Sequence, residues 1–108
     1  MKAYTDLSQS KKLAKILPLE SADMLYPSDF DFPFVWIEKP KKDKNATPCW
    51  SLAALLSVLK YPSLIQNVEE KWFVSEWTGK HHKVGGLYDN PIDACYEMIL
   101  KLHELNLL

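Results

Sequence analysis

The chain has 108 residues, of which 47% are hydrophobic and 25% charged, a composition typical of a folded globular protein and not of a disordered one. This length allows one hydrophobic core, so we expect a single domain over residues 1–108. All 13 basic residues are lysine and the formal net charge is −1, which argues against sequence-specific DNA reading and phosphoryl transfer, because both favour arginine.

The longest uninterrupted apolar run, Leu52–Leu56, is too short to span a bilayer, and Met1–Asp6 lacks the apolar region of a signal peptide. We therefore expect a cytoplasmic protein that does not contact a membrane. In that reducing compartment the two cysteines, Cys49 and Cys95, are expected to be free thiols.

A first helix is predicted over residues 7–17. Asp6 can act as the N-cap residue, Gln9 can complete a capping box, and Pro18 ends the helix. Its apolar side chains recur along one stripe, so we expect an amphipathic helix at the periphery of the domain.

Aromatic residues then recur at every second position, at Phe30, Phe32, Phe34 and Trp36. This period of two predicts a strand over about residues 34–38. The lysine-rich stretch 39–44 is predicted to be a solvated connector.

The second helix is predicted over residues 48–60, with Thr47 as its N-cap residue and Pro48 at the first helical position. Because most of its circumference is apolar, we expect it to be the most enclosed helix, covered by the domain or by a second copy of the chain. Cys49 would then lie at a helix N-terminus.

A β-hairpin is predicted from residue 71 to residue 85, with a loop at residues 78–80 and Glu76 opposite His82. A further short strand is predicted over residues 63–68.

The last helix, predicted over residues 91–105, combines Asn90 as N-cap residue with Pro91 at the first helical position. Its apolar arc also contains Cys95 and His103, which we expect to be a core residue and a partly buried structural residue, respectively. Together the elements predict an α+β fold, with three helices packed on one side of a small, mainly antiparallel sheet in the approximate order α-β-α-β-β-α.

Cys49 is the candidate catalytic residue, because the dipole and free N–H groups of a helix N-terminus stabilise a thiolate and lower its pKa. A thiol enzyme also requires a base, and the available histidines are His81, His82 and His103. No cysteine-protease signature surrounds Cys49. We favour the reading in which Cys49 is a small packing residue, and we assign no catalytic residue.

Neighbouring residues of a strand point to opposite faces, so His81 and His82 cannot easily bind one ion. The chain also lacks CxxC and HxxxH spacings, and we expect no metal and no cofactor. The lysines of residues 39–44 suggest a positively charged surface that could bind nucleic acid, but acidic neighbours reduce its positive charge. Weak nucleic-acid binding through these lysines is therefore only a further alternative.

A surplus of aromatic residues is the main indication of a binding surface, because exposed aromatic side chains are enriched where proteins meet. The predicted partner-binding residues are Phe32, Phe34, Trp36, Trp72 and Trp77.

Three segments that cover about half of the chain, Gln9–Met24, Thr47–Leu56 and Asp89–Leu108, resemble a group of small uncharacterised proteins from prophages and mobile elements of Bacteroidales gut bacteria. The resemblance implies a mobile-element origin and an α+β domain, and it transfers no activity and no catalytic residue.

We therefore expect a non-enzymatic protein-interaction or accessory module of a phage or mobile element, with a protein partner or self-association. The alternative is a thiol-dependent enzyme or redox protein that uses Cys49.

Overall fold

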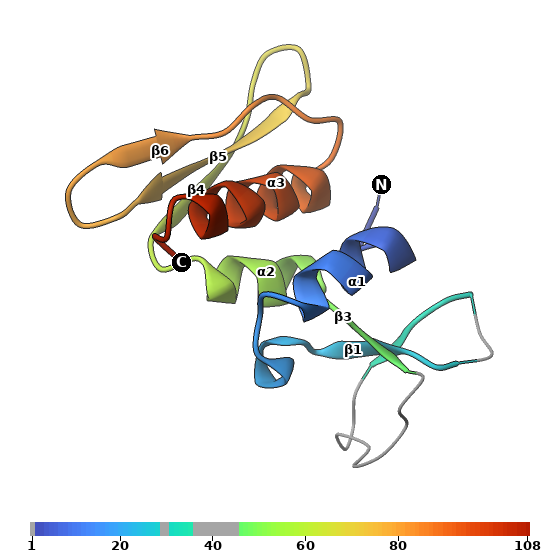
Figure 1. Cartoon of the computed structure of the whole chain (residues 1–108). Coiled ribbons are helices and arrows are strands. Elements are labelled where there is room, and N and C mark those ends of the chain that lie inside the picture. Colours follow the sequence, from blue (N-terminus) through green and yellow to red (C-terminus); the bar gives the residue numbers. More distant parts are fainter. Residues whose placement is uncertain (1, 29–30, 36–45) are drawn as a thin grey trace.

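The computed structural model describes residues 2–28, 31–35 and 46–108. Within these residues the predicted α+β class is confirmed (Figure 1). The elements in chain order are α1 (Leu7–Ala14), the 3₁₀ turn η1 (Leu19–Ser21), β1 (Met24–Tyr26), β2 (Phe34–Val35), β3 (Thr47–Cys49), α2 (Leu52–Val58), β4 (Pro62–Gln66), β5 (Trp72–Trp77), β6 (His82–Val84) and α3 (Pro91–Glu104).

The described strands form two antiparallel sheets, whereas the sequence predicted one. The strand order is β2-β1-β3 in the first sheet and β4-β5-β6 in the second. In Figure 1 the helices lie between the two sheets, with α1 against β3, α3 against β5, and α2 beside α3. The helices therefore separate two small sheets and do not cover one face of a single sheet.

Two predicted strands are found among the described residues. β2 covers the first residues of the strand predicted over 34–38, and β4 confirms the short strand predicted over 63–68. Residues 36–38 and the lysine-rich stretch 39–44 lie outside the described residues.

The first helix begins as predicted, with a complete capping box. The backbone N–H of Gln9 donates to Asp6 Oδ1 at 2.8 Å, and the backbone N–H of Asp6 donates to Gln9 Oε1 at 3.1 Å. The helix ends at Ala14, before the predicted Leu17, because the next turn tightens. There the N–H of Ile16 bonds to a carbonyl three residues earlier, at 3.0 Å.

The last helix also begins as predicted. Asn90 caps α3 by accepting a hydrogen bond of 2.8 Å from the backbone N–H of Asp93, and Pro91 occupies the first helical position. α3 has 14 residues, and no helix of the part described is long and apolar enough to cross a membrane.

The predicted start of the second helix is wrong. Thr47–Cys49 pairs with β1 as the edge strand β3, and α2 begins only at Leu52, with Ser51 as its N-cap residue. An edge strand tolerates Pro48, which has no N–H to donate. Cys49 therefore lies in a strand, not in the first turn of a helix.

The hairpin is present, but its register differs by one residue from the prediction. Trp77 pairs with His82, where the prediction placed Glu76 opposite His82. The turn is one residue longer than expected because Thr78 closes it: its Oγ1 donates to the carbonyl oxygen of His81 at 3.1 Å.

The core is built mainly by α3, whereas the sequence favoured the second helix. The buried residues of α3 are Pro91, Ile92, Ala94, Cys95, Tyr96, Met98, Ile99 and Leu102. In α2 the buried residues are Ala54 and Leu55, while Ala53 and Ser57 are exposed. His103 is exposed, whereas the sequence predicted a partly buried residue, because its side chain lines an open groove at the surface. One side of α2 is therefore left open.

Candidate functional site

Cys49 lies in a closed environment. Its side chain is 0% exposed, and its Sγ lies 3.4 Å from the carbonyl oxygen and 3.5 Å from the Oγ1 of Thr5. Burial raises the pKa of the Cys49 thiol, and the hydrogen bonds with Thr5 and Ser10 offset only part of this effect. A buried thiol with a raised pKa is neither accessible nor ionised at neutral pH, so this position lacks what a nucleophile requires.

The groups around Cys49 form a structural cluster. Thr5 Oγ1 accepts a hydrogen bond of 3.2 Å from the backbone N–H of Trp50 and lies 2.7 Å from Ser10 Oγ. The hydroxyl of Tyr26 donates to the carbonyl oxygen of Thr5 at 2.8 Å. Because Thr5 is fully buried, these bonds fasten the N-terminal segment to β1 and to the residues that follow β3.

Cys95 is a core residue, as predicted, with 0% exposure, and burial raises the pKa of its thiol to about 12. The three histidines are exposed. Nδ1 of His82 lies 3.3 Å from Oγ of Ser75. Among the described residues, no group of three His, Cys, Asp or Glu side chains is placed to hold a metal ion.

The predicted partner-binding aromatic residues lie in separate places. Phe32 and Phe34 are 53% and 46% exposed beside the first sheet, with ring centroids 5.3 Å apart. Trp77, at the end of β5, is 39% exposed, whereas Trp72 is half-buried against the core. Trp36 lies outside the described residues. The structure thus does not bring these described residues together into one surface.

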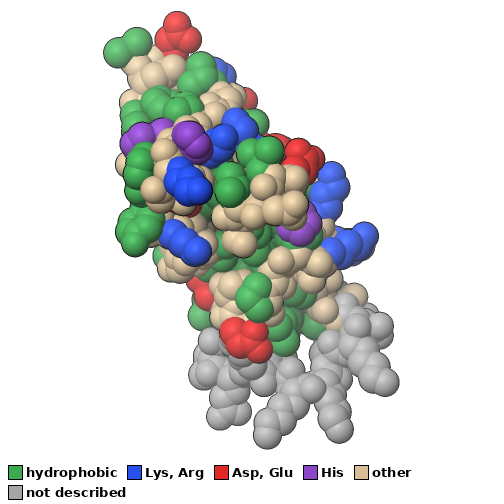
Figure 2. All heavy atoms as spheres, turned by 60° about the vertical axis from the view of Figure 1, so that its left-hand side comes forward, with side chains coloured by type: hydrophobic (Ala, Val, Ile, Leu, Met, Phe, Trp, Pro, Cys, Tyr) green, Lys and Arg blue, Asp and Glu red, His purple; other side chains and the backbone are tan. Residues whose placement is uncertain are grey.

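The surface over the β5–β6 hairpin mixes several kinds of side chain. Figure 2 shows hydrophobic, histidine and lysine side chains next to one another there. The ring of Trp77 lies 4.9 Å from that of His82, centroid to centroid. The two rings thus contact each other at the surface of the hairpin, and Trp77 also lines a small cavity of about 50 Å³ with Leu102 and Leu108.

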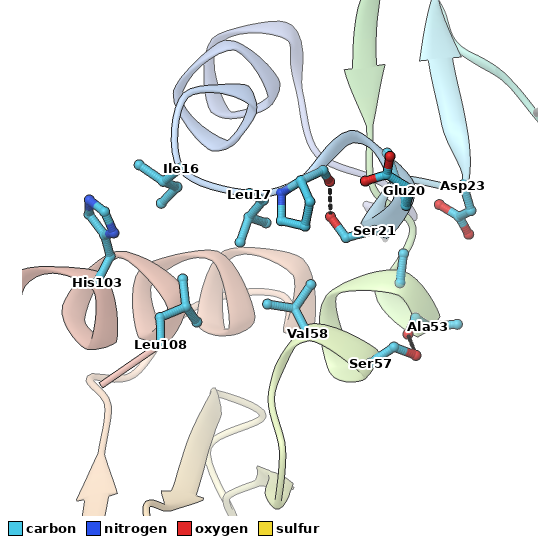
Figure 3. A pocket seen from close by; sticks show the side chains of 13 residues that line it. Ile16, Leu17, Glu20, Ser21, Asp23, Ala53, Ser57, Val58, His103 and Leu108 are labelled. Atoms are coloured by element: carbon cyan, nitrogen blue, oxygen red, sulfur yellow. Dashed lines mark hydrogen bonds between the residues drawn. The ribbon is translucent and has the colours of Figure 1, made fainter. Parts of the chain in front are cut away.

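Sequence reasoning missed a groove of about 710 Å³ that lies between the segment after α1 and helix α2 (Figure 3). This volume is in the range of natural ligand-binding clefts. The residues that line it are Ile16, Leu17, Pro18, Glu20, Ser21, Ala22, Asp23, Ala53, Ala54, Ser57, Val58, His103 and Leu108. One signal in the sequence was available: Ala53 and Ser57, spaced by four, form a stripe of small side chains on an otherwise apolar helix.

Hydrogen bonds fix the Asp23 side of this groove. Asp23 Oδ1 accepts a hydrogen bond of 2.9 Å from the backbone N–H of Ser51, and Asp23 Oδ2 accepts one from the Ser51 hydroxyl. Ser51 Oγ in turn accepts from the backbone N–H of Ala54 at 3.2 Å, which caps α2. The cap of α2 therefore also orients a carboxylate at the groove.

A second carboxylate lies on the same side. In Figure 3 Glu20 and Asp23 lie near each other at one end, with Ser21 beside them. Ser21 Oγ accepts a hydrogen bond of 3.0 Å from the indole N–H of Trp50 and donates one of 2.6 Å to the carbonyl oxygen of Pro18. These bonds connect the η1 turn to the core and hold this end in place.

The rest of the groove is mostly apolar. Figure 3 shows Leu17 and Val58 near its middle, and Ile16, Leu108 and His103 toward the end opposite Glu20. No cysteine and no lysine is among the described residues that line it. The groove therefore offers an apolar surface with acidic side chains at one end and no thiol.

Comparison of the chain with models of protein families, with curated proteins and with solved structures found no match.

Proposed function

We propose that this chain is a non-enzymatic protein-interaction module that binds a polypeptide segment of a partner protein in the groove between the η1 turn and α2. The observation that carries the proposal is the composition of this groove, which combines an apolar middle with few titratable side chains. Helical walls around an apolar groove are the setting in which proteins bind an apolar helical face of a partner.

The stripe of small side chains on α2 supports this proposal. Ala53 and Ser57 are exposed on a helix whose other side enters the core. Small side chains allow a second helix to approach closely. Large apolar side chains at these two positions would instead fill the groove. The exposed side of α2 is thus suited to a packed partner.

The buried thiols argue against the alternative of a thiol-dependent enzyme. Cys49 and Cys95 are both 0% exposed, and burial raises the pKa of both thiols. Neither cysteine lines the groove. A reagent bound in the groove would therefore meet neither sulfur atom.

The origin of the partner is part of the same proposal. The resemblance of residues 9–24, 47–56 and 89–108 to proteins of prophages and mobile elements favours a partner encoded by a host or by such an element. All three segments contain residues that line the groove, among them Leu17, Ala53 and His103.

A library of random 16-residue peptides displayed on phage tests the proposal. The folded chain should enrich peptides with apolar residues at helical spacing. Replacing Ser57 by Trp fills the groove from α2 and should abolish capture of the enriched peptides. Ser8→Trp is the matched control, because Ser8 is also an exposed helical serine but does not line the groove. Failure to enrich any peptide, or equal capture by the Ser57→Trp variant, would contradict the proposal.

The prediction for the exposed aromatic residues has its own test. Phe32→Ala and Trp77→Ala lie outside the groove, so each should leave peptide capture by the groove unchanged. A loss of binding to a full-length partner in either variant would extend the interface to that residue, in line with the energetic weight of aromatic residues at interfaces.

A further inference from the structure

We infer that the bound segment carries a lysine or arginine that pairs with Glu20 and Asp23, while its apolar residues lie along the groove toward Val58 and Leu108. This inference rests on the proposed function and adds to it the charge and the orientation of the partner. It follows from the distribution of charge around the groove, from the hydrogen bonds of Asp23 and from the arrangement of the lining residues.

The groove carries an excess of negative charge that the nearly neutral composition of the chain does not predict. The chain has 13 lysines and nearly equal numbers of acidic and basic residues. The described lining residues nevertheless include Glu20 and Asp23 and no lysine. The ion pairs found among the described residues use Lys2 and Lys71 and involve neither of these two carboxylates. The acidic end of the groove is thus available to a cation supplied by another molecule.

The hydrogen bonds of Asp23 leave it able to accept more. Each of its oxygens accepts one hydrogen bond from Ser51. A carboxylate has about four acceptor positions, so about two remain for an incoming donor. Because Ser51 belongs to the N-terminal cap of α2, the carboxylate is already oriented and little side-chain entropy is lost when a cation binds.

The arrangement along the groove fixes a direction. The two carboxylates lie at one end, whereas Leu108 and Ile16 lie toward the other (Figure 3). A segment with a cation at one end and apolar side chains further along matches this order. An acidic segment would place its carboxylate beside Glu20 and Asp23, and like charges that meet at an interface weaken binding.

The experiment uses the peptides enriched by the folded chain and lost with Ser57→Trp. Sequencing should show lysine or arginine next to the apolar positions more often than in the starting library. The most enriched peptide is then synthesised, and its affinity is measured by fluorescence anisotropy. Glu20→Lys should weaken its binding by about tenfold. Glu97→Lys, an exposed charge reversal on α3 outside the groove, should leave the affinity unchanged.

Replacing the basic residue of the peptide by glutamine provides a second measurement that does not depend on the stability of a protein variant. The glutamine peptide should bind the unmodified protein more weakly than the basic peptide does. This difference in affinity should largely disappear when the protein already carries Glu20→Lys. Groove-dependent peptides without a basic residue, or an unchanged affinity in Glu20→Lys, would overturn this inference and leave the proposed function standing. If no peptide depends on Ser57, the proposed function and this inference both fail.

Discussion

The ammonium group of Lys2 donates a hydrogen bond of 2.9 Å to Oδ1 of Asp93, 91 residues further along the chain. The same Asp93 oxygen accepts a hydrogen bond of 2.7 Å from the side chain of Gln9, and Oδ2 accepts one of 2.9 Å from Asn90. The contact joins the N-terminal segment, the start of α1 and the start of α3. One carboxylate thus connects the two helices whose caps the sequence predicted.

Replacing Asp93 by Asn should lower the free energy of unfolding by about 1–2 kcal/mol at pH 7, because charge-assisted hydrogen bonds from Lys2 and Gln9 are weakened in a partly buried site. Urea unfolding measures this change. Asp89→Asn is the control: Asp89 pairs with Lys71 on the exposed surface, and its loss should leave the unfolding midpoint unchanged. Equal effects of the two variants would contradict a special role for Asp93.

The same group predicts how stability depends on pH. Burial raises the pKa of Asp93. Hydrogen bonds from Lys2, Gln9 and Asn90, together with the positive charge of Lys2, outweigh burial and hold this pKa below the ordinary value of 3.8. A carboxylate whose pKa is lowered by folding stabilises the fold above its unfolded-state pKa, and this contribution is lost as the pH falls through the lowered value. Stability should therefore decrease below about pH 4. The decrease should be smaller in Asp93→Asn when urea midpoints are compared from pH 7 to pH 2.5.

Ser51→Ala should destabilise the protein by about 1 kcal/mol, because the serine hydroxyl caps α2 and also donates to Asp23. Ser57→Ala is the matched control in the same helix. The Ser57 hydroxyl is exposed and donates only to the carbonyl oxygen of Ala53 one turn earlier, so its loss should change the unfolding midpoint little. Thermal unfolding followed by circular dichroism at 222 nm compares the two variants, and a larger loss in Ser57→Ala would contradict the assigned cap.

The different outcomes for the three helix starts show what local sequence can predict here. Asp6 with Gln9, and Asn90 with Pro91, begin helices as the capping residues predict. The first turns of these helices do not pair with a strand, so the capping residues determine where each helix begins. Thr47 and Pro48 carry the same local signal, but their segment pairs with Met24–Tyr26, a distant strand with only weak local signals. Long-range pairing overrode the local preference, and Ser51 became the cap.

The groove was not predictable for a related reason. Its walls come from residues 16–23, which follow α1 and include η1, from α2, and from residues at and beyond the end of α3. No periodicity in one segment shows how three distant segments meet. The apolar pattern of the helix predicted over residues 48–60 indicated burial on most sides. The structure leaves Ala53 and Ser57 exposed instead, because α3 occupies the centre of the core.

The buried thiols should be protected from alkylation. Burial raises the pKa of Cys95 to about 12 and also raises that of Cys49, so little thiolate exists at pH 8 and the sulfur atoms are covered. Iodoacetamide at pH 8 should label neither cysteine in the native protein, and both in 6–8 M urea. Mass spectrometry after timed quenching gives the two rates. Fast native labelling of Cys49 would revive the thiol-enzyme alternative, and Cys95 serves as the internal standard for a core thiol.

Gly79 in the turn between β5 and β6 has a φ of +90°, in the left-handed region that side chains with a Cβ rarely adopt. Gly79→Ala should therefore cost about 1 kcal/mol of stability, although the site has open space around a new Cβ. Gly85→Ala is the control in the same hairpin. There a Cβ would lie at ordinary contact distances of 3.5 Å from Met98 Cε and 3.6 Å from the Val74 carbonyl oxygen, so the variant should be tolerated. Urea unfolding of both variants separates backbone strain from crowding, because strain predicts the larger loss at Gly79 and crowding predicts it at Gly85.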